Sequence, residues 1–333
     1  MAVTVSDVAK RAGVSRAAVS KALNDKPDIS QAVKRKIKRI AHEMGYTVNI
    51  AAKALSTNKT GTIGIIVGFP QIPTVAERII GIQEKAAEAG YLALTTFHSG
   101  KLQEEIDYLE KIKNRVDGLI MTPINPDKKL INALKSLSMP LVLMNEMLEG
   151  FNADFVGDDD EYGGEIGGKH LLTKTNKHIA YFGNNEKYYS DNSLIRGIKR
   201  AYEETGRNLN LFSNYWDNFS KENTEKNVAE ALAKNSDLEG IFAFSDMTAL
   251  WIIDYLSEQG VSVPEDIKVI GYDDIEFAKM SRISLTSIAQ PNREIGRSAA
   301  AMLIERIKAD NLRQAAPRKT IFPPELKIRQ SSC

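Results

Sequence analysis

The stretch TVSDVAKRAGVSRAAVSKALN, residues 4–24, predicts two short helices joined by a tight turn. Thr4 is suited to cap the first helix, because Asp7 follows three residues later beside the exposed amide groups of the first turn. Gly13 supplies the left-handed backbone that ends this helix, and Ser15 caps the next one. Two short helices around a glycine turn are typical of the helix-turn-helix.

The apolar positions of the two helices show which faces pack together and which residues are left on the outer surface. Val8 and Ala12 lie one turn apart on the first helix, and Val19 and Leu23 lie one turn apart on the second, so these faces are expected to pack together. In a helix-turn-helix, the second helix enters the major groove of DNA. The residues that remain to point outward from it are Arg16, Ala17, Ser20 and Lys21.

Charge is unevenly distributed along the chain. Residues 1–60 contain twelve Lys and Arg against four Asp and Glu, whereas the remaining residues contain 32 basic and 39 acidic side chains. The net charge of +1 therefore combines a basic N-terminal region with an acidic remainder. This asymmetry indicates a nucleic-acid-binding module attached to a part with another role. The alternative is that the basic run 34–39 is an ordinary solvated helix face.

Length and composition limit the class of protein. A chain of 333 residues with 43% hydrophobic content can bury large cores and is expected to form more than one domain. No apolar stretch approaches the roughly twenty residues of a membrane span, and no signal region is apparent, so a cytoplasmic protein without membrane contact is predicted. Cys333 is the only cysteine and the four histidines are scattered, so no metal or other cofactor is expected.

The segments after the motif have different characters. Ser30 is suited to cap a third helix, whose apolar residues recur at helical spacing up to Gly45. Residues 49–55 are rich in alanine and barely two turns long, so a helix there would be marginal alone in water. A polar linker, residues 56–61, follows.

From residue 62 onward, apolar runs alternate with amphipathic segments. Strands buried on both faces and separated by helices are typical of parallel sheets. Two such series predict two doubly wound lobes, with a ligand site in the cleft beyond the carboxyl ends of their strands. The predicted strands are residues 63–67, 92–96, 118–121, 141–144, 178–182, 240–244 and 268–272, and the predicted helices are 76–89, 104–113, 162–172, 194–204, 224–233 and 248–258.

The order of these modules resembles that of the lactose-repressor (LacI/GalR) family of bacterial transcription regulators, from residue 4 to residue 331. Besides the motif of residues 4–24, the sequence contains family-like stretches at 45–55, 244–246, 269–274, 285–291 and 326–331. The resemblance implies an N-terminal all-α helix-turn-helix domain followed by an α/β periplasmic-binding-protein-like core of two doubly wound parallel-sheet lobes.

The resemblance also implies domain boundaries. The helix-turn-helix domain would span residues 1–48, a hinge helix and linker 49–61, and the effector-binding core 62–333. Within the core, the amino lobe would contain residues 62–160 plus 292–320, and the carboxyl lobe 161–291 plus 321–330.

The family's DNA contacts map onto the N-terminal part of the sequence. Arg16 and Ala17 resemble the residues that read base edges, since an Arg can bind guanine bidentately and a small Ala can meet a thymine methyl. Lys21 stands where many members have Arg, and a lysine is a single-point donor. Leu55 matches a leucine that is wedged into the minor groove, the alternative being that it packs on its own domain. The full set implied is Thr4, Ser15, Arg16, Ala17, Ser20, Lys21, Asn24, Asn49, Ala52 and Leu55.

The family's effector contacts map onto the core. Arg196 and Asp273 match recurrent ligand contacts, which would grip sugar hydroxyls from opposite sides of the cleft. Phe219 matches an aromatic residue that stacks on the ligand. The alternatives are an Arg196–Asp273 ion pair within the protein and a core role for Phe219. The full set implied is Arg196, Asp273, Phe219, Asn192, Asp246 and Asp160. The acidic run 158–161 could bind a metal, although the start of a helix explains it as well.

The function implied is that of a homodimeric repressor of carbohydrate-utilisation genes. Its affinity for double-stranded operator DNA would be changed by a small effector, a sugar or sugar phosphate. An alternative is a carbon-catabolite regulator whose effector is a serine-phosphorylated carrier protein. In this sequence Ala299, Ala300 and Ala301 stand where that branch uses a basic residue, although Arg293 and Arg297 precede them. An enzyme is not expected, because neither a nucleophile–base constellation nor a phosphate loop is present.

Overall fold

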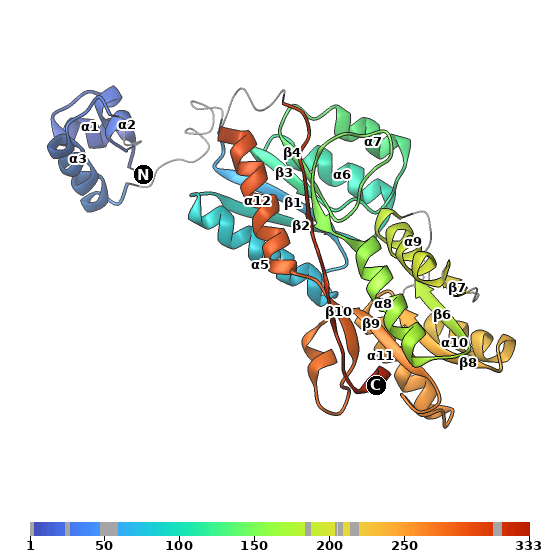
Figure 1. Cartoon of the computed structure of the whole chain (residues 1–333). Helices are drawn as coiled ribbons and strands as arrows, with labels where there is room; N and C mark the ends of the chain where they lie inside the picture. The colour runs from blue at the N-terminus through green and yellow to red at the C-terminus, as the bar shows by residue number, and fades with distance from the viewer. Residues whose placement is uncertain are drawn as a thin grey trace. The chain divides into compact units, whose positions relative to one another are not determined.

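The computed structural model of the chain describes residues 3–23, 27–46, 59–183, 188–203, 205, 209–213, 220–308 and 315–333. The chain separates into two compact units, Met1–Thr60 and Gly61–Cys333. Figure 1 shows both units, and each is described here by itself. In the described part of the chain, none of the helices has both the length and the apolar character needed to cross a membrane.

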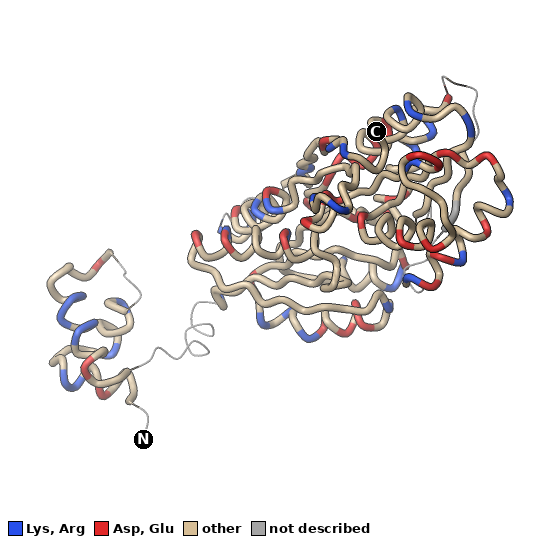
Figure 2. Tube along the Cα trace, turned by 90° about the horizontal axis from the view of Figure 1, so that it is seen from below, with Lys and Arg blue, Asp and Glu red and all other residues tan. Residues whose placement is uncertain are grey.

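The first unit is a three-helix domain built as its caps predict. It contains α1 (Val5–Ala12), α2 (Arg16–Leu23) and α3 (Gln31–Glu43). Thr4 and Asp7 form a capping box at the start of α1, and Gly13 ends that helix with a φ of 70°. Val8, Val19 and Ile37, one from each helix, are fully buried in a shared core. In Figure 2, Lys and Arg are frequent along these helices, whereas both signs of charge alternate along the second unit.

The second unit contains two lobes, each built on a six-stranded sheet. The amino-lobe sheet has the order β11-β5-β4-β3-β1-β2, and the carboxyl-lobe sheet has the corresponding order β12-β10-β9-β8-β6-β7. The strands are β1 (Thr62–Gly68), β2 (Leu92–His98), β3 (Gly118–Met121), β4 (Leu141–Met144), β5 (Asp154–Asp158), β6 (His178–Gly183), β7 (Leu209–Ser213), β8 (Leu238–Ala243), β9 (Lys268–Asp273), β10 (Thr286–Ala289), β11 (Lys319–Phe322) and β12 (Glu325–Lys327). All pairings are parallel except that between β10 and β12.

Helices cover both faces of each sheet, which confirms the predicted fold class. The described helices of this unit are α5 (Pro73–Glu88), α6 (Leu102–Ile112), α7 (Lys128–Lys135), α8 (Asp160–Lys174), α9 (Tyr189–Glu203), α10 (Lys221–Lys234), α11 (Asp246–Glu258) and α12 (Asn292–Lys308). The chain passes from one sheet to the other after β5, after β10 and between β11 and β12. The crossing segments therefore lie beside the carboxyl ends of the strands.

Strand β1 shows why its sequence is continuously apolar. Ile63, Ile65 and Val67 pack into the core under α5 and α12, whereas Ile66 belongs to the core under α6 and α7. Gly64 lies on the latter face, where an added Cβ would come within 2.6 Å of a methyl group of Ile112. Successive side chains thus enter opposite cores, as expected for a strand covered on both faces.

Two helix pairs cross so closely that only glycine fits at the crossing. In the amino lobe, a Cβ on Gly81 of α5 would lie 2.1 Å from the carbonyl oxygen of Arg293, and one on Gly296 of α12 would lie 2.0 Å from that of Arg78. In the carboxyl lobe, Gly164 of α8 and Gly197 of α9 make the same reciprocal approach, at 2.1 and 1.9 Å from carbonyl oxygens. Each lobe thus has one glycine-crossed helix pair.

Candidate functional site

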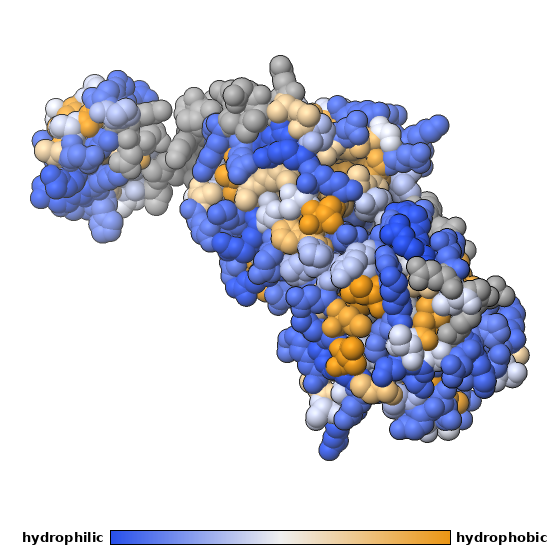
Figure 3. All heavy atoms as spheres, in the orientation of Figure 1, coloured by the Kyte–Doolittle hydropathy of each residue, from blue (hydrophilic) through white to orange (hydrophobic). Residues whose placement is uncertain are grey.

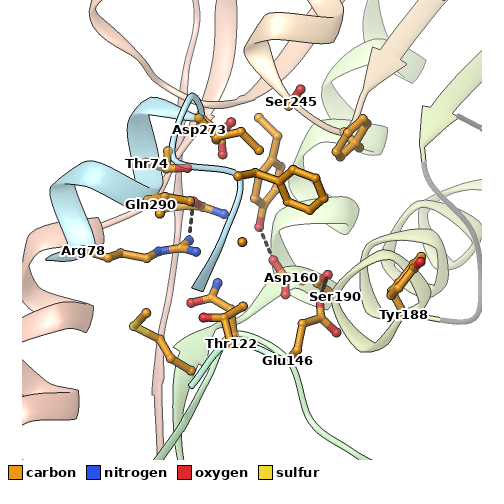
Figure 4. Close-up of a pocket in the computed structure, with 18 of the residues that line it drawn as sticks. Thr74, Arg78, Thr122, Glu146, Asp160, Tyr188, Ser190, Ser245, Asp273 and Gln290 are labelled. Atoms are coloured by element: carbon orange, nitrogen blue, oxygen red, sulfur yellow. Dashed lines mark hydrogen bonds between the residues drawn. The ribbon is translucent and has the colours of Figure 1, made fainter. Parts of the chain in front are cut away.

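A cavity of about 150 Å³ lies between the two sheets, at the carboxyl ends of their strands. This is the position at which doubly wound sheets bind ligands. Figure 4 shows its polar side chains converging from both lobes. The amino lobe supplies Val67, Gly68, Phe69, Ile72, Thr74, Val75, Arg78, Thr122, Ile124, Met144, Asn145 and Glu146, and the carboxyl lobe and crossing segments supply Asp160, Tyr188, Ser190, Asp191, Leu194, Phe244, Ser245, Tyr272, Asp273 and Gln290.

Three residues that line the cavity have backbone conformations rare for residues with side chains. Phe69 follows β1 with a φ of 51°, Asn145 follows β4 with a φ of 63°, and Asp273 ends β9 with a φ of 122°. Such conformations cost roughly 1–3 kcal/mol each and are concentrated at functional sites. Their position around one cavity supports its assignment as a binding site.

Arg78 is the basic side chain of the described cavity lining, and it is held by three side chains on two segments. Its guanidinium donates to Asn292 Oδ1 at 2.7 Å, to Gln290 Oε1 at 2.9 Å and to Asp158 Oδ2 at 3.2 Å. The side chain is only 10% exposed, and that of Asp158 is fully buried. Arg78 therefore ties α5 to the end of β5 and to the crossing segment after β10.

The carboxyl groups of the cavity are close to one another, with Asp160 and Asp191 buried and Glu146 and Asp273 half-buried. Asp160 accepts a hydrogen bond from Tyr272 Oη at 2.9 Å, and burial, followed by the neighbouring Asp158 charge, raises the pKa of Asp160 well above its usual value. The pKa of Asp273 is likewise raised well above its usual value, by burial and by the charge of Asp246. Burial and the neighbouring negative charges thus favour the protonated form of both groups.

Glu146 joins the two lobes across the cavity. It extends from the segment after β4 and accepts hydrogen bonds from the Ser190 hydroxyl and, at 2.9 Å, from the Tyr189 amide at the start of α9. Burial raises the pKa of Glu146 to about 8, with the charge of Asp191 acting in the same direction. Asp191 in turn accepts a hydrogen bond from Tyr181 Oη at 2.8 Å.

Three of the effector residues implied by the sequence lie at or beside the cavity. Asp160 and Asp273 line it. Asp246 lies directly behind, where it accepts hydrogen bonds from Ser287 Oγ at 2.6 Å and from the Ile275 amide at 2.8 Å. Burial raises the pKa of Asp246 to about 7. Asp246 thus supports the loop that follows Asp273.

Arg196 and Asn192 do not line the cavity, contrary to expectation. The Arg196 side chain is 48% exposed, and its Nε lies 3.1 Å from a carboxylate oxygen of Glu161. Its Nη1 donates to Asn192 Oδ1, and no Arg196–Asp273 pair forms. The reason is helical phase, since Asp191 and Leu194 of α9 face the cavity and a residue two positions after Leu194 lies on the opposite side.

Sequence reasoning missed Arg78, Glu146 and Asp191. A signal existed for Arg78, which lies on the apolar stripe of its helix, one turn before the buried Ile82. A charged residue in such a stripe must find buried partners. Glu146 carries no local signal, because its partners are on an element 43 residues later in the chain.

The acidic run 158–161 separates into four different roles. Asp158 pairs with Arg78, and Asp159 caps α8 by accepting from the Tyr162 amide at 3.0 Å. Asp160 binds Tyr272, and Glu161 pairs with arginines of α9. Within the described ranges, no group of His, Cys, Asp and Glu residues has the arrangement of a metal site.

The predicted DNA-facing side chains of α2 are exposed. Arg16, Ala17 and Ser20 lie on its outer face, as does Lys21, whose ammonium group is 2.5 Å from Asp28 Oδ2. Ser15 caps α2 by accepting from the Ala18 amide at 3.1 Å. Four implied DNA contacts, Asn24, Asn49, Ala52 and Leu55, and the implied effector contact Phe219 lie outside the described residues.

Comparison with known proteins finds a match for each of the two units and relatives that contain both. Residues 4–49 match the family model described as bacterial regulatory proteins, lacI family, and residues 169–332 match a periplasmic binding protein-like domain. The HTH-type transcriptional repressor PurR of Photobacterium profundum is 32% identical over 333 residues, which cover 98% of each chain.

Two solved structures extend this comparison. The lac repressor dimer bound to operator and the anti-inducer ONPF aligns with a TM-score of 0.86 at 21% identity, over 100% of this chain and 99% of that one. A LacI family transcriptional regulator from Enterococcus faecium with bound ribose aligns with a TM-score of 0.70 at 29% identity, over 81% of this chain and 98% of that one. The first of these likenesses covers both units in one fold.

Proposed function

The chain belongs to the lacI family of bacterial regulatory proteins, and from this premise we propose that a small molecule in the cavity controls its affinity for a specific operator. It is a DNA-binding transcriptional repressor rather than an enzyme. The small molecule is proposed to be sugar-like, and the regulated genes to serve the use of carbohydrates. As a DNA-binding repressor, it would act in the bacterial cytoplasm.

The observation that carries this proposal is that both lobes contribute to one cavity. Glu146 on one lobe binds the start of α9 on the other, and Arg78 binds the crossing segment through Gln290 and Asn292. A molecule between these groups contacts both lobes at once, so its binding free energy depends on how the lobes are arranged. Linkage then requires that DNA and effector alter each other's affinity by the same factor.

On the DNA side, we assign base contacts to Arg16 and Ala17 at the start of α2. Both side chains are exposed, and the cap at Ser15 fixes the helix end from which they project. We place Lys21 near the DNA as well, where it exchanges Asp28 for a phosphate or a base. The hinge segment 49–61 and its Leu55 stay in the proposal as the minor-groove contact.

We further propose a homodimer, because apolar side chains are exposed where a second copy can cover them. Leu92, Leu94 and Phe97 are exposed on β2, an edge strand of its sheet, and Phe277 and Met280 are exposed on the carboxyl lobe. Polar side chains cover most of the face shown in Figure 3, with apolar patches on both lobes. A two-fold dimer would present its recognition helices to a palindromic operator.

The phosphoprotein alternative gains no support from α12. Arg293 is paired with Glu84, and Arg297 is paired with Glu84 and Glu88 of α5. Both guanidinium groups are thus engaged by carboxylates of the neighbouring helix. Recognition of a phosphoserine would have to break these pairs.

The test is to select operator duplexes from a random pool with the full chain and then to measure their affinity by fluorescence anisotropy. Arg16→Ala is expected to weaken the selected site about tenfold or more, and to relax preference at one base pair. Lys226→Ala, on an exposed position of α10, is the matched control. If the Arg16 variant binds the selected duplex as tightly as the parent and prefers it over scrambled duplexes to the same degree, base reading lies elsewhere.

A further inference from the structure

We propose that the effector of this protein is a small organic cation, a sugar-like body carrying a protonated amine. This assignment rests on the proposed function, since it names the chemical class of the molecule that the cavity takes. It excludes sugar phosphates from the set of effectors.

The charge of the cavity lining is the first argument. Four carboxyl groups line it, those of Glu146, Asp160, Asp191 and Asp273, whereas Arg78 is the one basic side chain among the described lining residues. Figure 4 shows Glu146 and Asp160 on one side of the space and Asp273 on another. A ligand between these groups is surrounded by acidic side chains.

The engagement of Arg78 is the second argument. Its guanidinium already bonds to the carboxylate of Asp158 and to the amide oxygens of Gln290 and Asn292. Both hydrogens of Nη2 and that of Nε are thus taken, so a phosphate could be gripped bidentately only by displacing one of these partners. An anionic ligand would also be repelled by the ionised fraction of the surrounding carboxyl groups and would favour their protonation further.

The unpaired acceptor atoms of the site are the third argument. Asn145 lines the cavity and is 8% exposed, and its Oδ1 has no hydrogen-bond partner in the described structure. Asp158, which accepts from Asn145 Nδ2 through its Oδ2 but is not itself a lining residue, also has an unpaired Oδ1. An ammonium group has three donors and no acceptor, so it fits a site with acceptors to spare. A phosphate, which brings only acceptors at its ionised oxygens, does not.

The shape and the walls of the cavity set the rest of the ligand. A volume of about 150 Å³ accommodates a single six-membered ring. Phe69, Phe244 and Tyr188 contribute aromatic walls, and Leu194 of α9 contributes an apolar one. Aromatic faces attract cations and stack on rings, so both parts of an amino sugar find a matching surface.

Binding of a cation has a consequence for protons. Glu146 faces Asp191 and the start of α9, and Asp160 faces Asp158, Glu146, Arg78 and Tyr272. Burial among these groups favours the protonated carboxyls before the ligand binds. An ammonium group favours the ionised carboxylates, so it is expected to expel protons as it enters.

The experiment compares ligands that share a ring and differ in charge. Glucosamine, N-acetylglucosamine, glucose and glucose 6-phosphate, with the corresponding galactose series and with putrescine, are titrated into the full chain by calorimetry at pH 6.5. Two buffers of different ionisation enthalpy report proton release. An amine is expected to bind at least tenfold more tightly than its hydroxyl and N-acetyl counterparts, with release of protons. A preference for a neutral or phosphorylated member would overturn the assignment.

Variants locate the effect. Glu146→Gln and Asp160→Asn are each expected to reduce the preference for the amine at least fivefold, and Arg200→Ala, on the exposed side of α9, is expected to leave it unchanged. An amine preference that all three variants retain would contradict the assignment to these carboxyls. The ligand comparison on the unaltered chain holds even where a variant fails to fold.

Operator binding by the same preparation separates this inference from the proposed function. If none of the amines binds while the protein still binds its selected operator, the cationic class is wrong and the repressor stands. If operator binding itself is absent, the proposed function fails first.

Discussion

The two lobes use the same helix pairing in different settings. In the amino lobe, α5 and α12 cross at Gly81 and Gly296, and in the carboxyl lobe α8 and α9 cross at Gly164 and Gly197. In both pairs, two arginines one turn apart on one helix meet two glutamates four residues apart on the other. Arg196 and Arg200 of α9 thus correspond to Arg293 and Arg297 of α12. Arg196 belongs to the outer surface of a helix crossing, not to the cavity.

The pairs differ in what lies beneath them. Helix α5 carries a buried arginine, Arg78, which holds the crossing segments, whereas α9 presents Asp191 and Leu194 to the same cavity. The contribution of an arginine to the stability of this protein therefore depends on how deeply its ion pair is buried. Exposed pairs stabilise by at most about 1 kcal/mol, whereas removal of one member of a buried pair costs about 3–5 kcal/mol.

The strongest test of this difference is Arg78→Met. It removes the guanidinium from Asp158, and the free energy of unfolding is expected to fall by about 3–5 kcal/mol, because a buried carboxylate is left uncompensated. Urea unfolding of the full chain measures the effect. The double variant Arg78→Met, Asp158→Asn should recover part of the loss. A loss below about 1 kcal/mol for Arg78→Met alone would remove the distinction between the two pairs.

A second test concerns the glycine crossings, for which the lobes should behave alike. Gly197→Leu and Gly296→Leu are each expected to destabilise the core by about 3 kcal/mol, since a side chain there must push backbone apart. Ala229→Leu, at an exposed position of α10, adds similar bulk and is the control. Thermal unfolding should show both glycine variants shifted and the control close to the parent. A shift in one lobe only would break the symmetry.

The pH dependence of the free energy of unfolding tests the buried cavity groups separately from the exposed ion pairs. The folded-state pKa of Glu146 is about 8, above its ordinary value of 4.5, so the folded chain holds a proton that the unfolded chain loses. Its stabilising contribution is therefore complete below pH 4.5 and is lost as the pH rises through 8. Between pH 6 and pH 8, Glu146 alone is expected to lower the free energy of unfolding by about 2 kcal/mol.

The measurement is urea unfolding at both pH values, with Glu146→Gln as the comparison. The variant cannot ionise at this position, so its stability should fall less over the same interval. Arg196→Ala, which alters only an exposed pair, should follow the parent. If Glu146→Gln shows the same slope as the parent, other groups determine the pH response.

The smallest expected effect is that of Arg196→Ala. Its ion pair with Glu161 is exposed, so the loss of stability should stay below about 1 kcal/mol, the same as for Arg293→Ala in the other pair. Its affinity for the effector should equal that of the parent, in contrast to Asp273→Asn. Loss of effector response in a folded Arg196 variant would return this residue to the binding site.

Local features of the molecule could be predicted from the sequence. The caps at Thr4 and Ser15 and the strands β3 and β4 follow from short-range patterns, and these elements form as expected. Strand β12 is a three-residue strand at the edge of its sheet with one apolar residue, Leu326, so no apolar run predicts it. Alternation of apolar runs and helices was sufficient for the fold class.

The site could be predicted only in part. The family resemblance implied Asp160 and Asp273, and both lie at the carboxyl ends of buried strands, beside the cavity. Arg196 was misplaced because a match to a motif does not fix the phase of a helix, and two positions are enough to turn a side chain away. Glu146 and Arg78 depend on partners from distant segments, which sequence spacing does not reveal.

Because residues around the cavity have positive φ angles, selection for thermal stability alone is expected to damage the binding site. Phe69, Asn145 and Asp273 each hold a conformation that glycine would adopt without strain. A library screened only for heat resistance is thus expected to enrich glycine at these positions, and each such gain would delete a side chain from the cavity. Repeated rounds of such screening would yield a protein that is more stable to heat but no longer binds its effector.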